Sequence, residues 1–319
     1  MKTGIVSQHA NVGPTNKNSA AVEWGRLNNY SRWVHYDFSD ASTITISGSN
    51  NNPIDYIDDK GPREIVCEAG FRNTHPYTKT PEHIVDGSGQ NGHDYCSAVS
   101  SSTEDFAFSN GTDTQLSARA FTLVYVFDFE HTGTSENNDQ VLLQLYGDSS
   151  AVGGYTAGEF RTMVLQVDKE QLLGSTISRF EFILTKNNGD AVSLTKDSTE
   201  GSQAAVVNPN QGGDYGYNFN YIYVVGRSDG TAEMYIRGVL LTSGGAGTFP
   251  DETTTAGNGS RLFNSLSGVT NTASSTKCYE VIIFNQELST NELKEIDWYI
   301  INKYNYEKGR AFGHPIEGV

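Results

Sequence analysis

The feature that most constrains the fold of this chain is a series of short apolar runs separated by turn-forming residues. The clearest run is 121–130 (FTLVYVFDFE), where apolar side chains occupy both alternating faces before Asp128 and Glu130 end it. Because successive side chains of a strand point to opposite faces, we predict a strand buried on both faces at first and solvated at its end. Similar runs occur at 141–146, 160–167, 179–185, 221–226, 233–241 and 278–284.

The segments between these runs carry turn residues and no helical periodicity. Residues 226–230 (GRSDG) separate two runs, and Arg237 and Gly238 interrupt another where a two-residue turn requires a positive φ. Residues 187–190 (NNGD) follow the run at 179–185 in the same way. Short strands joined by tight turns predict an all-β, antiparallel sandwich of two sheets.

One helix is predicted near the C-terminus. Ser289 and Glu292 form a capping box, in which each side chain satisfies the other residue's backbone N–H. Leu288 and Leu293 flank this cap at the positions of a hydrophobic staple.

The residues after the cap predict a helix that packs against a sheet. An apolar stripe recurs at intervals of three and four residues: Leu293, Ile296, Ile300 and Tyr304. The charged residues Glu295, Asp297 and Lys303 are predicted to lie outside this stripe.

Several segments resemble a known protein module. They are residues 36–50 (YDFSDASTITISGSN), 57–61 (IDDKG), 234–240 (MYIRGVL) and 279–304, which runs from the last strand through the helix. They resemble the concanavalin A-like, laminin-G-like jelly-roll module found in bacteriophage virion proteins and microbial surface proteins. The resemblance implies a jelly-roll sandwich with one C-terminal helix, and this fold hosts lectins, hydrolases and structural modules alike.

The predicted organisation is one domain with two extensions. Residues 1–32 lack either periodicity and read as an extended arm, 33–306 form the sandwich, and 307–319 form a tail. The arm has no counterpart in the family pattern, and the insert 72–96 is longer than that pattern needs.

Net charge excludes one class of partner. Lys and Arg number 22 against 38 Asp and Glu, which gives a net charge of −16. Nucleic-acid binding depends on a basic patch, so we expect none. No stretch approaches the about 18 apolar residues of a membrane span, and no signal-peptide run begins the chain. We therefore expect a protein that is made and kept in a cytoplasm.

The sequence lacks a complete set of catalytic residues. A glycoside hydrolase on this fold needs two converging carboxylates, which related glucanases carry as E-x-D-x-E or E-x-D-x-x-E. Neither pattern occurs, and the nearest arrangement is Asp128 and Glu130 beside His131. The GxSxG string at 226–230 lies between two strands, whereas a nucleophile elbow needs a helix after the serine. We expect no enzyme, with a divergent glycoside hydrolase as the less favoured alternative.

Metal binding is also not predicted. His75, His83 and His93 share one segment, but their spacing matches no common ligand pattern, so we interpret them as surface histidines. Asp58 and Asp59 offer oxygen ligands of the kind Ca²⁺ prefers, without EF-hand spacing. No cofactor is predicted, and Ca²⁺ stays the alternative.

The three cysteines do not indicate a disulfide or a metal centre. Cys67, Cys96 and Cys278 are odd in number, widely spaced and without a CxxC pair. Reduced and partly buried thiols are predicted.

A sugar site is the better candidate for binding chemistry. Residues 212–221 (GGDYGYNFNY) interleave aromatic rings, which stack on sugars, with side chains that bond hydroxyl groups. The candidate glycan-binding residues are Asp214, Tyr215, Tyr217 and Asn218. The alternative is that the aromatic residues alternate because the next strand begins early and one of its faces is core.

The resemblance and the missing catalytic set lead to a functional hypothesis. We expect a non-enzymatic bacteriophage virion structural protein, assembled in the host cytoplasm and displayed on the particle as a capsid decoration, head fibre or tail-associated protein. Its partners would be other virion proteins, held through the N-terminal arm, and further copies in a homo-oligomer. The alternative is a lectin-like adhesin that binds host cell-surface glycans.

Overall fold

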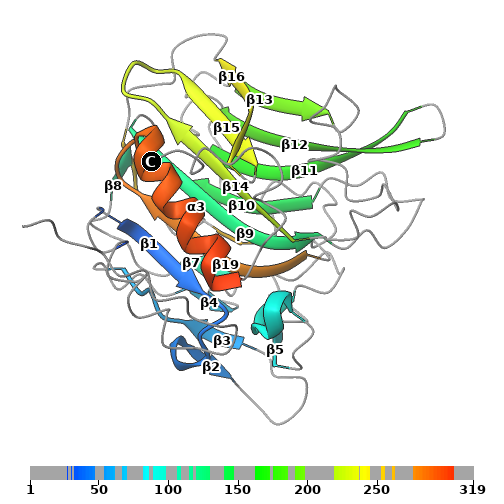
Figure 1. Ribbon diagram of the computed structural model, residues 1–319, viewed down its shortest axis with the longest axis vertical. Coiled ribbons are helices and arrows are strands. Elements are labelled where there is room, and N and C mark those ends of the chain that lie inside the picture. The colour runs from blue at the N-terminus through cyan, green and yellow to red at the C-terminus, as the bar shows by residue number, and fades with distance from the viewer. Residues whose placement is uncertain are drawn as a thin grey trace, which may run out of the picture.

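The computed structural model describes most of the strand-forming part of the chain (Figure 1). The described residues are 27, 30, 32–46, 54–61, 67–69, 82–85, 89–97, 106–108, 115–117, 120–129, 140–146, 162–172, 175–185, 191–197, 219–236, 238–244, 253–255, 261–262 and 276–304. Within these ranges, no helix combines the length and apolar character that crossing a membrane requires.

Within the described residues, two large antiparallel sheets and the C-terminal helix form the main layers, as the sequence predicted. Sheet A has the order β16 (Val239–Gly244), β15 (Ala232–Ile236), β14 (Phe219–Gly226), β9 (Phe121–Phe129), β19 (Thr276–Phe284), β6 (Tyr95–Ser97), β5 (Glu82–Ile84). In addition, β1 (Arg32–Asp37) pairs with β19. β1 and β6 lie on the same edge of β19, where β6 pairs with residues 277–278 and β1 with residues 280–284.

Sheet B faces one side of sheet A. Its order is β13 (Ala191–Asp197), β12 (Ser175–Thr185), β11 (Thr162–Leu172), β10 (Gln140–Tyr146), β18 (Arg261–Leu262), β7 (Phe106–Phe108), β4 (Cys67–Ala69), β3 (Ile54–Ile57), β2 (Ile44–Ile46). A separate two-stranded sheet pairs β17 (Thr253–Thr255) with β8 (Gln115–Ser117). Two 3-10 turns are η1 (Ala41–Thr43) and η2 (Gln90–Gly92).

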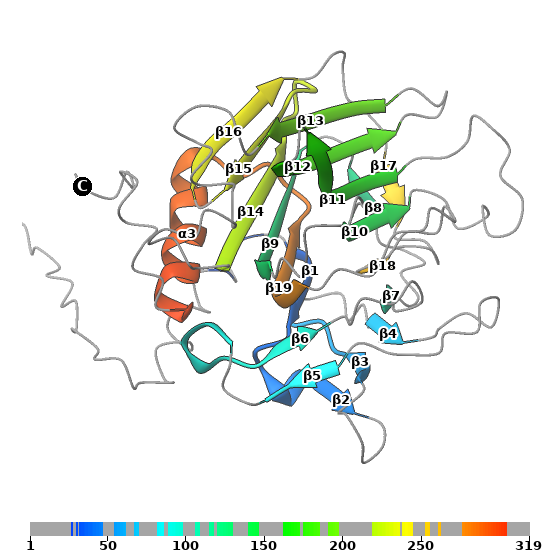
Figure 2. The same ribbon diagram turned by 90° about the vertical axis from the view of Figure 1, so that its right-hand side faces the viewer.

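The helix α3 (Thr290–Tyr304) covers the other side of sheet A. Figure 2 shows the resulting layers, with α3 on one side, β14 and β9 in the middle, and β10 to β13 on the far side. The central strands of sheet A therefore contact apolar groups on both faces.

The alternation along β9 places its side chains in two separate cores. Leu123, Tyr125 and Phe127 belong to the core between the sheets, whereas Val124 and Val126 belong to the core beneath α3. All five are at most 3% exposed, which confirms that this run is buried on both faces. Sheet B completes the inter-sheet core with Leu142, Leu143, Met163, Leu165, Phe182, Leu194 and Leu262.

The start of α3 has the predicted cap. Ser289 N donates to Glu292 Oε2 at 2.7 Å, and Glu292 N donates to Ser289 Oγ at 3.4 Å. Leu288 and Leu293 both lie in the core beneath α3. This cap begins the helix where its apolar stripe meets sheet A.

The segment before β1 also contacts this layer. Leu27 is buried in the core beneath α3, and Tyr30 O–H donates to Glu295 Oε2 at 2.6 Å. The Tyr30 ring packs edge-on against Phe284 at 6.0 Å. The rest of the predicted arm and the predicted tail lie outside the described residues, so the domain limits stay a prediction.

Both hairpins of sheet A turn where the sequence predicted. In the β14–β15 turn, Arg227 N donates to Thr231 O at 2.8 Å and Gly230 has a φ of 86°. In the β15–β16 turn, Gly238 has a φ of 75°. The strands β12 and β13 also pair as a hairpin, although residues 187–190 between them lie outside the described ranges.

Gly238→Ala is expected to destabilise the protein more than Gly92→Ala. Both glycines have positive φ, at 75° and 72°, but a Cβ at Gly238 would overlap the Asp297 carboxylate, whereas Gly92 has open space. We expect a loss of about 2–3 kcal/mol for Gly238→Ala and about 1 kcal/mol for Gly92→Ala, measured by urea unfolding. Equal losses would contradict a steric role for Asp297.

Candidate functional site

The predicted glycan-binding segment lies directly before β14. Asp214, Tyr215, Tyr217 and Asn218 are outside the described residues, and the described strand begins at Phe219. The glycan-binding assignment of these four residues therefore stays a prediction.

The described part of sheet A shows where this segment enters. Phe219 pairs with Asp128 near the end of β9, and Asp128 also pairs with Lys277 near the start of β19. Lys277 Nζ lies 4.8 Å from the centre of the Tyr95 ring on β6. At this end of sheet A the described residues of β14, β9, β19 and β6 therefore lie next to one another.

The structure does not test the pair Asp128 and Glu130 as hydrolase carboxylates. Asp128 occupies a register position in β9, whereas Glu130 and His131 lie outside the described residues. Ser228 of the GxSxG string is exposed in the turn between two strands, and its amide donates to Glu287 Oε2 at 2.5 Å. This arrangement is a hairpin turn rather than a nucleophile elbow.

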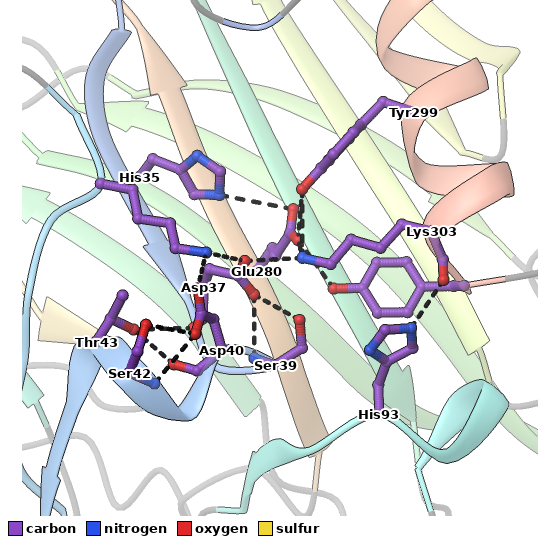
Figure 3. Close-up of polar contacts among 12 residues, drawn as sticks. His35, Asp37, Ser39, Asp40, Ser42, Thr43, His93, Glu280, Tyr299 and Lys303 are labelled. Carbon is purple, nitrogen blue, oxygen red and sulfur yellow. Dashed lines mark hydrogen bonds and ion pairs between the residues drawn. The ribbon is translucent and has the colours of Figure 1, made fainter. Parts of the chain in front are cut away.

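A different cluster of polar groups lies beneath α3 (Figure 3). We call it the buried polar cluster, and its members are His35, Asp37, Lys60, Glu280, Tyr299, Lys303 and Tyr304. They come from β1, the turn after β3, β19 and the last turns of α3.

Strand alternation explains why three of these residues face the helix. Val34 and Tyr36 of β1 enter the inter-sheet core, so His35 and Asp37 point to the opposite face. Asp37 pairs directly with Glu280 of β19, which places the two carboxylates on neighbouring strands beneath α3.

Lys303 joins the two carboxylates. Its Nζ donates to Asp37 Oδ2 at 2.8 Å and also to Glu280 Oε1, and its side chain is only 7% exposed. Glu280 Oε1 further accepts from Tyr299 O–H at 2.9 Å and from Tyr304 O–H at 3.0 Å. One carboxylate oxygen therefore receives three donors from α3.

Asp37 is held by a second set of donors. Lys60 Nζ lies 2.6 Å from Asp37 Oδ2 and 2.6 Å from Asp40 Oδ2, and Ser39 Oγ donates to Asp37 Oδ1 at 2.6 Å. Burial would raise the pKa of Asp37, but the ammonium groups of Lys303 and Lys60 outweigh it and hold that pKa well below its usual range. Asp37 is consequently an ionised carboxylate.

His35 is neutral and oriented. Burial lowers the pKa of His35 well below its ordinary value. Arg32 Nη1 lies 3.4 Å from His35 Nδ1, and because a guanidinium can only donate, this nitrogen is the acceptor. The ring proton is then on Nε2, which lies 3.7 Å from Glu280 Oε2.

The ligand atoms of His35, Asp37 and Glu280 lie within 4.8 Å of one another, which is the spacing of a metal site. The ammonium group of Lys303 already contacts both carboxylates, and that of Lys60 contacts Asp37. Two ammonium groups thus balance the two buried carboxylates, and a divalent cation would meet their repulsion at short range. The cluster is therefore an internal ion network that attaches α3 to β1 and β19.

The structure also corrects the predicted exposure of two helix residues. Lys303 and Asp297 were expected outside the apolar stripe, yet Lys303 lies in the cluster and Asp297 is 3% exposed. Tyr223 O–H on β14 donates to Asp297 Oδ1. Both predictions were wrong because each charge is compensated by a strand residue distant in sequence.

Two of the three histidines are likewise not on the surface. His83 is 1% exposed on β5, and its Nε2 lies 3.8 Å from Asp94 Oδ2. His93 is half-buried and donates from Nε2 to the Lys303 carbonyl at 2.8 Å, which satisfies a free C=O in the last turn of α3. His75 lies outside the described residues.

The remaining candidates have structural contacts. Asp59 Oδ1 accepts from His35 N at 2.7 Å and from Gly61 N at 2.6 Å, so this carboxylate orders the turn beside β1, and Asp58 is exposed. Cys67, Cys96 and Cys278 are all buried, where the sequence predicted partly buried thiols.

The fold is similar to that of known binding domains. No protein-family model matches the sequence, and no curated protein matches it. The binding domain of Paraclostridial mosquitocidal protein 1 superposes with a TM-score of 0.53 at 10% identity, over 85% of this chain and 53% of that one. The botulinum neurotoxin binding domains give 0.52 at 13% identity for serotype D, over 86% and 53%, and 0.51 at 13% for serotype G, over 84% and 50%.

These similarities define the class of fold. The chain has a jelly-roll sandwich fold similar to that of these toxin binding domains, and it spans about half of their length. At this level of identity the shared property is the fold.

Lys303→Met is expected to destabilise the protein strongly. It leaves Glu280 and Asp37 buried with one ammonium group fewer, which costs about 3–5 kcal/mol in the free energy of unfolding. Lys294→Met on the same helix, where the side chain is partly exposed, should change it by less than about 0.5 kcal/mol.

A double variant tests the cause of that loss. Adding Glu280→Gln to Lys303→Met removes one uncompensated charge and keeps an oxygen that accepts from Tyr299 and Tyr304. We expect part of the stability to return in chemical denaturation. A double variant less stable than Lys303→Met would contradict the electrostatic account.

Proposed function

We propose that this protein is a non-enzymatic, lectin-like binding module that recognises a carbohydrate on a cell surface. The observation that carries the proposal is the fold, which covers most of the chain and matches binding domains of toxins. The aromatic and polar segment before β14 supplies the side-chain types that a sugar needs.

The buried polar cluster supports a binding role over hydrolysis. A glycoside hydrolase presents its two carboxyl groups in an open groove, with space for substrate and water. Asp37 and Glu280 are instead at most 3% exposed. Lys303 and Tyr299 of α3 and Lys60 of the turn after β3 contact them. Their chemistry is used to hold α3 in place.

The position of the segment 214–218 fits the proposed site. It precedes β14 at the end of sheet A that also holds Lys277 and Tyr95. A ligand at this end can contact residues from several strands without disturbing either core. Aromatic stacking would supply apolar contact, and Asp214 and Asn218 would select hydroxyl groups.

A glycan array with the full chain tests this proposal. We expect selective binding by the wild type and a loss of about tenfold or more in affinity for Tyr215→Ala and for Tyr217→Ala, since each removes a stacking surface. The matched control is Tyr56→Ala on sheet B, an exposed tyrosine that should leave binding unchanged. No binding by the wild type to any array glycan would contradict the proposal.

We further propose that the module is displayed on a bacteriophage particle, as a capsid decoration, head fibre or tail-associated protein, in several copies. The resemblance of residues 279–304 to virion jelly-roll modules and the net charge of −16 favour this setting, because like charge keeps an exposed surface from aggregating. The N-terminal arm would attach it to neighbouring virion proteins during assembly in the host cytoplasm.

Deletion of residues 1–26 tests the attachment. The cut keeps Leu27 and Tyr30, which pack against sheet A and α3, so the sandwich should retain its melting temperature. We expect the shortened protein to be missing from purified particles, as measured by immunoblotting. Incorporation at the wild-type level would count against the arm as the anchor.

A further inference from the structure

The buried polar cluster brings an amine and a carboxyl group into contact in a closed environment. Lys303 Nζ on α3 contacts Glu280 Oε1 on β19, and the two side chains are 7% and 0% exposed. Lys303 extends across to the strand in Figure 3, with Tyr299 beside it. An amine held against a carboxyl group with water excluded has the arrangement that favours condensation.

Glu280 rather than Asp37 is the carboxyl group suited to react. Glu280 Oε1 accepts from Tyr299 O–H at 2.9 Å and from Tyr304 O–H at 3.0 Å. These two fixed donors would stabilise the negative charge that develops on that oxygen when an amine adds to the carbon. Asp37 contacts the ammonium groups of both Lys60 and Lys303, whereas Glu280 contacts that of Lys303, so the ionised form of Asp37 is the more strongly stabilised of the two.

The amine has a proton acceptor beside it. Asp37 Oδ2 lies 2.8 Å from Lys303 Nζ and accepts a hydrogen bond from it. Burial lowers the pKa of Lys303, against the opposing effect of Asp37, and this increases the share of neutral amine. Asp37 is thus placed as a proton relay for the nucleophile.

The second oxygen of Glu280 has a different environment. Among the described residues Glu280 Oε2 accepts no hydrogen bond, and it faces His35 Nε2 at 3.7 Å. Because Arg32 donates to His35 Nδ1, the Nε2 atom carries the ring proton. A neutral N–H group therefore faces the oxygen that would leave, and its partial positive charge favours negative charge on that oxygen.

We propose that Lys303 and Glu280 form an intramolecular amide bond that links α3 covalently to β19. The Lys303 ammonium loses two protons, Nζ forms a bond to Glu280 Cδ, and the bond from Cδ to Oε2 breaks. Both protons go to the leaving oxygen, with Asp37 Oδ2 as their first acceptor from Nζ, and this oxygen departs as one water molecule. The reaction consumes one positive and one negative charge and needs no oxidant or further reactant.

The link would add a covalent bond to the anchor of the helix. It closes a loop from Glu280 to Lys303, which contains the end of β19 and nearly all of α3. Such a link restricts the unfolded chain as a disulfide does. The proposal is independent of carbohydrate binding.

Intact-mass measurement of the denatured full chain tests the bond. The wild type is expected about 18 Da below the mass of its sequence, the mass of one water. Digestion should then release one branched peptide that joins Glu280 to Lys303. Lys303→Arg keeps the cation but has no primary amine, so it should have its full sequence mass.

Other outcomes would overturn the proposal. Wild type at its full mass after prolonged incubation under native conditions excludes the bond. A loss that persists in Lys303→Arg comes from another site, such as an imide at Asp229-Gly230, and also excludes it. If Lys303→Arg does not fold, acetylation of denatured wild type decides, because Lys303 should stay unlabelled while Lys294 is labelled, and labelling of Lys303 overturns the proposal.

Discussion

Burial of sheet A on both faces is the constraint on which the rest of the structure depends. Its central strands contact sheet B on one side and α3 on the other, so every second residue of β1 and β19 must suit the layer beneath the helix. Most positions meet this with apolar side chains. His35, Asp37 and Glu280 do not, and the helix supplies the cation and hydroxyl donors that they require.

This arrangement makes the helix part of the electrostatics of the sheet. Lys303 contacts a carboxylate on each of two neighbouring strands, and His93 contacts the carbonyl of the same residue at the end of α3. Further along the helix, Asp297 Oδ1 accepts a hydrogen bond from Tyr223 O–H on β14. Polar contacts along the helix, as well as its apolar stripe, therefore position α3 on sheet A. Because these contacts are directional, they specify one position of the helix along the strands.

The buried polar cluster and the proposed sugar-binding segment have different roles in this domain. The cluster is closed, charge-balanced and structural, whereas the segment 214–218 enters β14 at the end of the sheet. A rigid, doubly covered sheet is a suitable support for binding residues in the segments at its ends.

The sequence by itself determined the strands β9 to β12, β14 to β16 and β19, two hairpin turns and the cap of α3, because alternation, positive-φ glycines and a capping box act between near neighbours. The sequence also places Lys303 two helical turns after Ile296, which puts its side chain near the apolar stripe rather than outside it. Only the tertiary structure decided that Lys303 is buried, because its partners Asp37 and Glu280 are 266 and 23 residues away. A charged side chain is stable in a core only when an opposite charge contacts it there. The pairing of β1 with β19 places Asp37 beside Glu280, where Lys303 can contact both.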